Sequence, residues 1–409
     1  MRFSRDRDGV WWAVFLSCLL VVVCVARLPS QSIRAISFVL TANGVYLAFA
    51  VFLFFRVNKW LGLWVALVIV SAQLPFYAVN VDGTLNVRFT GLMRQSSLNA
   101  RDAIIVMSLW YALIVTLIPK STVDIILDAV CVVALINAFI VICQHCSFDV
   151  VGWLTGDRWR LHSLKAAGAA GLMGNSNTTS GLLAMCFLPF MRNRWRLKIH
   201  RTLFRVPVLP VLSVSVLIAM AWTYSSNGAM ALAAAVVFIL PFVFFKTEND
   251  RHLALAQTII SLILIIMACF FFWLLIDRPG ISGRIDIWKL GWAQFANRPL
   301  RGMGIGHWNY LTQQLHAHND IWQMTFDMGI LAPMLIAGYI VSALRRTRWD
   351  NLILQGCLVV ITVDAFIAFP MHIATTAIVA VTLMALLNIE VKTKLCRGRN
   401  EDLRCGSCG

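Results

Sequence analysis

Long apolar runs alternate with short polar connections along most of the chain. The runs are rich in Leu, Val, Ile, Ala and Phe and extend over roughly 17–25 residues, the length that an α-helix needs to cross a bilayer. A transmembrane barrel would instead show segments of about ten residues with alternating polarity. We therefore expect an all-α polytopic membrane protein with about twelve transmembrane helices. Their predicted ranges are 10–26, 35–55, 61–79, 103–119, 123–142, 168–190, 204–223, 227–245, 253–276, 319–343, 352–370 and 373–390.

The composition supports the same fold class. Hydrophobic residues make up 59% of the 409 positions, charged residues make up 13%, and the mean hydropathy is +0.77. Soluble globular chains carry about 25% charged residues. No internal repeat or long linker divides the sequence, so we expect a single integral-membrane domain over residues 1–409. The apolar run after the charged N-terminus lacks a small-residue cleavage site, which predicts an uncleaved first span.

The net charge of +16 does not indicate nucleic-acid binding. Every Lys and Arg except Arg205, which lies at the start of the span 204–223, is outside the predicted spans. Their density alternates from one connection to the next, as expected for residues that orient a membrane protein. The pattern places both termini in the cytoplasm and residues 277–318 on the opposite side. The basic residues that remain on that opposite side either contact an anionic ligand or belong to solvated loops.

Residues 277–318 form the longest polar connection, and connections of this length are usually functional or disordered. Regular aromatic and glycine punctuation argues against disorder. Within it, 284–296 is expected to be a short helix whose apolar face carries Trp288 and Trp292. This helix either lies in the membrane interface or packs on the bundle. The glycines of the following GMGIG segment predict a tight, close-approach turn without the spacing of a dinucleotide-binding motif.

Polar residues recur one helical turn apart where the tenth predicted span begins. A carboxylate at the centre of a membrane helix costs ~2.5–3.5 kcal/mol, so such residues usually face the protein interior or a watery cavity. Each of these side chains therefore either serves the function or pairs between helices. The residues of this stripe are His316, Asp320, Gln323 and Asp327, and Asp128 and Asp364 are similar exceptions in other spans.

His318 combines with Arg284 and Arg301 in the same connection. An imidazole can remove the proton of an attacking hydroxyl, a function typically worth about 10²–10⁴-fold in rate. Guanidinium groups bind phosphate oxygens in pairs and keep their charge. Glycosyl transfer from a lipid diphosphate needs these two functions and no metal or other cofactor. A histidine at a helix start is ordinarily an interfacial residue, but the two arginines favour a functional one.

The cysteines do not indicate a metal site. The pairs Cys143/Cys146 and Cys405/Cys408 are both CxxC, but the predicted topology puts them on opposite sides of the membrane, whereas a zinc site would need them together. Cys143 and Cys146 either form a disulfide or are inert.

At these residues the sequence resembles the O-antigen ligase and O-antigen polymerase superfamily of bacterial inner-membrane, GT-C-like glycosyltransferases. The resemblance extends from Gly171 to about Tyr339. His318-Asn319 followed, after nine residues, by Gly329 matches the ligase motif. The other matching segments are SGRIDIW (282–288), NRPLRGMGIGHWN (297–309) and GLMGNSNTTSG (171–181), which is similar to the family's Gly-Asn-x-Asn segment.

The resemblance implies a glycan donor linked to undecaprenyl diphosphate, an acceptor that is lipid A–core or a second lipid-linked glycan, and a periplasmic catalytic loop at 277–318. His318 takes the position of the family's catalytic histidine, and Arg284 takes an arginine position. The expected substrate-binding residues are Arg301, Asn319, Gln323, Asn177 and Arg160.

Two positions depart from the family pattern. Asn227 stands where the family commonly has an arginine in Ser-Arg-Gly, so Arg301 or Arg160 would have to replace that arginine. Ala332-Pro333 stands where the ligase pattern continues to a second glycine. The His-Asn spacing favours a ligase, and the two departures keep a polymerase as the alternative. A twelve-span transporter using Asp128, Asp327 and Asp364, or a membrane scaffold, is a more distant reading.

Overall fold

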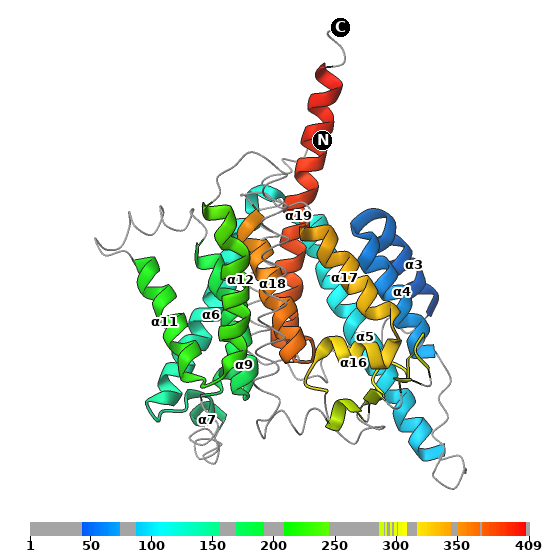
Figure 1. Ribbon diagram of the computed structural model, residues 1–409, viewed down its shortest axis with the longest axis horizontal. Coiled ribbons are helices and arrows are strands. Elements are labelled where there is room, and N and C mark those ends of the chain that lie inside the picture. The colour runs from blue at the N-terminus through cyan, green and yellow to red at the C-terminus, as the bar shows by residue number, and fades with distance from the viewer. Residues whose placement is uncertain are drawn as a thin grey trace.

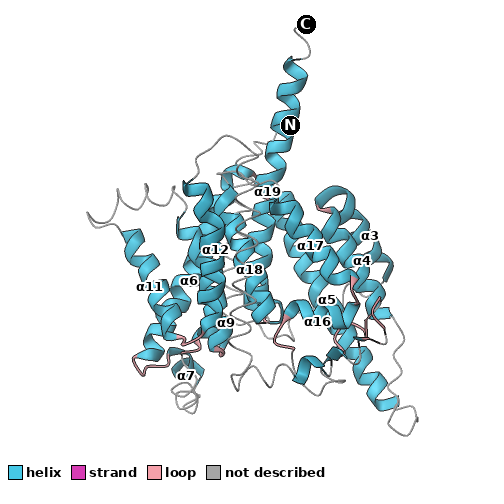
Figure 2. Ribbon diagram, viewed as in Figure 1, coloured by secondary structure: helices cyan, strands magenta, loops and turns pink. Residues whose placement is uncertain are grey.

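All regular secondary structure in the described part of the chain is helical, and Figure 2 shows helices joined by loops without a strand there. The computed structural model describes residues 43–73, 87–155, 169–191, 208–244, 286–289, 291–292, 295–296, 298–300, 302–308, 317–344, 351–368 and 370–405.

Except for Val150–Thr155, which no span predicted, the helices of the N-terminal half each overlap a predicted span, although the helix predicted over 103–119 begins much earlier, at Val87. They are α3 (Asn43–Phe52), α4 (Lys59–Gln73), α5 (Val87–Leu117), α6 (Val123–His145), α7 (Val150–Thr155), α9 (Ser176–Phe187), α11 (Val208–Trp222) and α12 (Ser226–Phe244). Short 3-10 or π turns join some of them: η2 (Leu53–Val57), η3 (Lys120–Thr122), η4 (Gly171–Met173) and η5 (Leu188–Met191).

The C-terminal half contains α16 (Asp320–Met328), α17 (Leu331–Leu344), α18 (Leu352–Ile367), η7 (Pro370–His372) and α19 (Ala374–Cys405). The predicted spans 10–26 and 253–276 lie outside the described residues. Two helical stretches, Leu98–Leu117 and Lys120–His145, are long and apolar enough to cross a membrane, and shorter apolar helices of 10–17 residues surround them within the described part.

The predicted single helix over 319–343 is wrong, because the chain breaks into α16 and α17. Gly329 ends α16 with φ +78°, a left-handed conformation that favours glycine. The N–H of Ile330 then donates to the carbonyl of Pro299 (2.9 Å) instead of continuing the helix. As a result α16 lies across one end of the bundle and α17 runs back into it (Figure 1).

The described bundle has two distinguishable ends in Figure 1. The end that carries α16 and α7, called here the α16 end, is opposite the end from which the C-terminal part of α19 projects. Helix α9 lies at the centre of one half, where it contacts α6, α11, α12, α18 and α19. All of its residues from Thr178 to Phe187 are buried, so α9 is a core helix.

Close helix packing around α9 depends on glycine. A Cβ on Gly228 of α12 would overlap the backbone of Ser180, and the Gly228 N–H donates to Ser180 Oγ (3.1 Å). A Cβ on Gly181 of α9 would overlap the carboxyl group of Asp364 on α18. Small residues of this kind let membrane helices approach closely. They also place a buried carboxyl group directly against α9.

We predict that Gly181→Ala destabilises the bundle by about 1–3 kcal/mol, because the added methyl group must displace the Asp364 side chain in a packed core. Thermal unfolding of the purified full-length protein in detergent measures the loss. In an Asp364→Ala background the carboxyl group that the methyl would overlap is absent. Adding Gly181→Ala to that background should therefore cause no loss of stability. A Gly181→Ala single variant as stable as the wild type would disprove this packing.

Candidate functional site

Helix α16 holds three separate loops through polar side chains on its buried face. Asp320, Gln323 and Asp327 are each at most 5% exposed, and each accepts a backbone N–H from a different segment. The bonds run from Met371 N to Asp320 Oδ2 (2.7 Å), from Ala317 N to Gln323 Oε1 (3.1 Å) and from Gly306 N to Asp327 Oδ2 (3.1 Å). The polar stripe read from the sequence is therefore a set of loop anchors. Its fourth predicted member, His316, lies outside the described residues.

The predicted close-approach turn at the GMGIG segment is confirmed. Its glycines have positive φ, and a Cβ on Gly302 would overlap the backbone of Asp327 and Gly329. Three consecutive N–H groups hold the turn, two on carbonyls in the C-terminal part of α16 and one on a hydroxyl of α4. Met303 N donates to Phe326 O (2.9 Å), Gly304 N to Asp327 O (2.7 Å), and Ile305 N to Ser71 Oγ on α4 (3.2 Å).

His318 occupies a backbone position that its neighbours determine. The N–H of Ala317 bonds to Gln323, and its carbonyl accepts the indole N–H of Trp288 (2.7 Å). On the other side, Asn319 Oδ1 accepts from Trp322 N (2.8 Å) and caps α16. Between them, half-buried His318 has φ +54°. Such a conformation costs a non-glycine residue of order 1–3 kcal/mol and is found mainly where the surroundings impose it, often at functional sites.

A depression of about 460 Å³ lies at the start of α16, next to Asn319, and is called here the tryptophan groove. It is lined by Trp288, Lys289, Trp292, Asn319 and Trp322. Trp292 stacks on Trp322 with 5.7 Å between ring centroids and 23° between ring planes, yet 57% of Trp292 is exposed. Lys289 is exposed at the rim beside Asp286 (3.4 Å). The groove therefore combines fixed aromatic faces with a polar edge.

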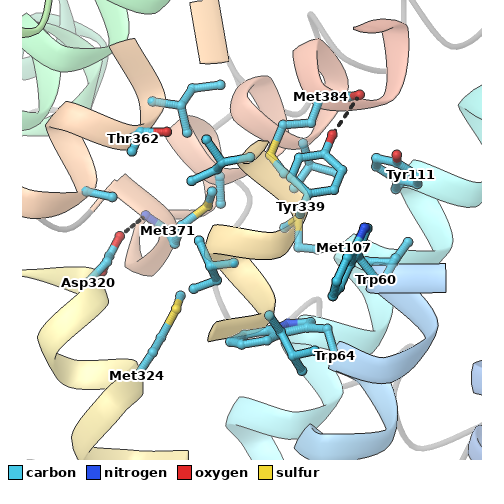
Figure 3. Close-up of a pocket in the computed structure, with 18 of the residues that line it drawn as sticks. Trp60, Trp64, Met107, Tyr111, Asp320, Met324, Tyr339, Thr362, Met371 and Met384 are labelled. Atoms are coloured by element: carbon cyan, nitrogen blue, oxygen red, sulfur yellow. Dashed lines mark hydrogen bonds between the residues drawn. The ribbon is translucent and has the colours of Figure 1, made fainter. Parts of the chain in front are cut away.

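An apolar cavity of about 200 Å³ lies on the inner side of α16 (Figure 3). Its walls come from α4, α5, α16, α17, α18 and α19, and Asp320 is one of its few polar lining residues. Figure 3 shows Asp320 accepting from Met371 and, further in, Tyr339 donating to the Met384 carbonyl (3.3 Å). Four methionines line it: Met107, Met324, Met371 and Met384. Methionine side chains adapt to flexible apolar ligands.

The other unusual carboxylates have different settings. Asp364 is 1% exposed, and its Oδ1 has no hydrogen-bond partner among the described residues. Asp128 is half-buried on α6. Cys143 and Cys146, at the end of α6, are both free thiols rather than a disulfide.

The structure brings together three of the predicted site residues: His318, Asn319 and Gln323 lie at the start of α16. Asn177 lies in the first turn of α9, where its Oδ1 accepts from Ser225 Oγ (2.7 Å) in the turn between α11 and α12. Arg284, Arg301 and Arg160 lie outside the described residues. In the described part of the chain, no group of three or more His, Cys, Asp or Glu side chains is placed to hold a metal ion.

Sequence reasoning did not identify the tryptophan groove as a site. The four-residue spacing of Trp288 and Trp292 predicted a shared helix face, and residues 286–289 and 291–292 are indeed helical. Trp322 belongs to a different helix, so no local pattern could connect it with them. A scan against protein-family models finds no match to this chain, and a search of curated proteins finds no significant relative.

We predict that Trp288→Phe loosens the segment before α16, because it keeps an aromatic ring and removes the N–H that holds the Ala317 carbonyl. Losing one such bond costs about 0.5–1.5 kcal/mol, so amide exchange in the peptide covering 317–323 should accelerate roughly 2- to 12-fold. Hydrogen–deuterium exchange with mass spectrometry measures it. Trp153→Phe, at a tryptophan on α7 that is 72% exposed, is the matched control and should leave that peptide unchanged. Equal exchange in both variants would contradict the role of Trp288.

Proposed function

We propose that this chain is a multi-pass glycosyltransferase of the bacterial inner membrane, similar to O-antigen ligases. In this proposal about twelve helices span the membrane, both termini are cytoplasmic and the α16 end faces the periplasm. The enzyme moves a glycan from undecaprenyl diphosphate to a hydroxyl group of lipid A–core. The polymerase alternative differs only in the acceptor, which would be a second lipid-linked glycan.

One observation carries this proposal: the segment 318–320 lies between two different binding environments. Asp320 lines the apolar cavity, Asn319 lines the tryptophan groove, and His318 precedes both with a fixed, uncommon backbone conformation. A lipid-linked sugar has an apolar tail and a polar head, and transfer takes place where they join. A general base belongs at that junction.

The apolar cavity supports a lipid donor. Its lining is almost wholly apolar and comes from six helices. At about 200 Å³ it holds only the part of the isoprenoid chain next to the diphosphate, and the rest of the chain lies outside it in this proposal. The methionines in its wall suit a flexible isoprenoid. Because α16 closes one end of this cavity, a diphosphate attached to the chain would reach the level of His318.

The chemistry needs one proton acceptor and one anion site. His318 takes the proton from the acceptor hydroxyl as its oxygen bonds to the anomeric carbon. The bond between that carbon and the diphosphate oxygen breaks, and the diphosphate leaves with the bonding electrons. Arg284 and Arg301 bind the diphosphate in this proposal, and their guanidinium groups stabilise the charge that develops on it.

The transporter alternative is less well supported by the site. One of the three carboxylates that it would use, Asp327, accepts the N–H of Gly306. The backbone carbonyl of Asp327 also accepts the N–H of Gly304 in the same glycine turn. This carboxylate is therefore engaged in holding a loop. Such a role explains its presence in a buried helix without ion coupling.

We predict that His318→Ala lowers glycan transfer by about 10²–10⁴-fold, the usual contribution of a general base, without lowering the amount of protein in the membrane. The measurement is a lipopolysaccharide gel of a deletion strain carrying each variant. His145→Ala, at the α16 end of α6, is the matched control and should behave as wild type. Full activity of His318→Ala would refute the mechanism.

The same gel distinguishes the two acceptors. Loss of the whole ladder, with polymer still on its lipid carrier, identifies a ligase. A core that carries one repeat unit identifies a polymerase.

We also predict that Arg284→Ala and Arg301→Ala each lower transfer roughly 10- to 150-fold, because a hydrogen bond to a charged group contributes about 1.5–3 kcal/mol. Arg284→Lys should restore little, since lysine cannot form the paired bond. Arg278→Ala, in the same connection, is the control for a general loss of positive charge. Equal activity in all these variants would remove the arginines from the diphosphate site.

A further inference from the structure

We propose that the tryptophan groove is the subsite that binds the terminal sugar of the acceptor. This inference rests on the proposed function for the identity of its ligand, because the groove is lined by Asn319, the residue that follows the proposed base. The groove itself is defined independently, by Trp288, Lys289, Trp292, Asn319 and Trp322.

The aromatic faces of the groove are held in place before any ligand binds. Trp288 is fixed by its bond to the Ala317 carbonyl (2.7 Å), and Trp292 is stacked against Trp322. Trp322 also packs edge-on against Phe295, with 5.9 Å between ring centroids. Rigid aromatic side chains lose little conformational entropy when a ligand binds. The exposed part of Trp292 is thus a preformed stacking surface.

The rim of the groove is polar. Lys289 and Asp286 are 73% and 76% exposed, and the Oδ1 of Asn319 caps α16, which leaves its amide N–H groups as donors. A sugar ring has an apolar face of C–H groups and a periphery of hydroxyls. It therefore matches an aromatic floor with a polar edge, whereas a hydrocarbon chain would not. The volume of about 460 Å³ lies within the range of ~300–1,000 Å³ usual for ligand pockets.

The position of the groove identifies the acceptor rather than the donor. In a direct displacement at an anomeric carbon, the attacking oxygen enters on the side opposite to the leaving group. The donor lipid, and with it the leaving diphosphate, belongs to the cavity that Asp320 lines. The groove and the cavity share no lining residue, and they meet the chain at Asn319 and Asp320 respectively. In this assignment the sugar in the groove therefore supplies the attacking hydroxyl, and the donor occupies the separate cavity. Both lipid A–core and a lipid-linked repeat unit end in sugars, so the assignment holds for either acceptor.

The test is saturation-transfer difference NMR on the full-length protein in nanodiscs, with cellobiose as a neutral probe and digalacturonate as an acidic one. An aromatic stacking partner contributes about 0.5–1.5 kcal/mol, so Trp292→Ala should weaken the binding of both sugars roughly 2- to 12-fold. Lys289→Ala should weaken only digalacturonate. Trp153→Ala removes a tryptophan that is 72% exposed on α7 and should change neither.

Three outcomes would overturn the assignment. The first is that the wild-type protein binds neither sugar, and the second is that Trp292→Ala binds both as well as the wild type. In the third, binding occurs in detergent but is lost in nanodiscs, which would mean that lipid headgroups occupy the groove.

The binding test is independent of turnover, so the two proposals can fail separately. If His318→Ala keeps full transfer activity while Trp292→Ala still loses sugar binding, the transferase mechanism fails and the saccharide site stands. If His318→Ala loses transfer while Trp292→Ala binds sugars normally, the groove assignment fails and the mechanism stands.

Discussion

Three hydrogen bonds to one short helix hold the α16 end together. Asp320, Gln323 and Asp327 accept backbone N–H groups from the segments at Met371, Ala317 and Gly306. A buried N–H without an acceptor costs about 1–3 kcal/mol, so detaching any of these segments from α16 is unfavourable. The short glycine turn can approach because a Cβ at Gly302 is absent. The positions of the cavity, His318 and the groove all follow from this arrangement.

These bonds also explain why polar residues persist in an apolar helix. A carboxylate in such a place would be costly if it served no partner. Here each polar side chain accepts a backbone N–H from a segment outside α16: the 3-10 turn η7, the residue before His318 and the glycine turn. The bond from Ala317 to Gln323 also fixes the residue before His318. In the proposed mechanism this bond orients the base in advance, and such orientation is a large part of how enzymes lower barriers.

Much of the fold could be read from the sequence, because apolar runs have helical length and glycine marks close contacts. The helical spacing of Asp320, Gln323 and Asp327 predicted that they share one face. It did not predict their hydrogen-bond partners, which lie in three different segments outside the helix. The break at Gly329 was missed because the apolar pattern continues through it, and only the backbone of Pro299 reveals why the helix stops. The groove was invisible because Trp322 is remote in sequence from Trp288. The predicted arginines lie outside the described residues, so their part in the site rests on sequence alone.

The proposed junction between lipid and sugar at residues 318–320 can be tested most directly by cryo-electron microscopy of the full-length protein in nanodiscs with undecaprenyl diphosphate. We expect isoprenoid density in the cavity lined by Met107, Met324 and Met384, with the diphosphate beside His318. A lipid diphosphate bound at the opposite end of the bundle, or a His318 side chain directed away from it, would contradict this arrangement.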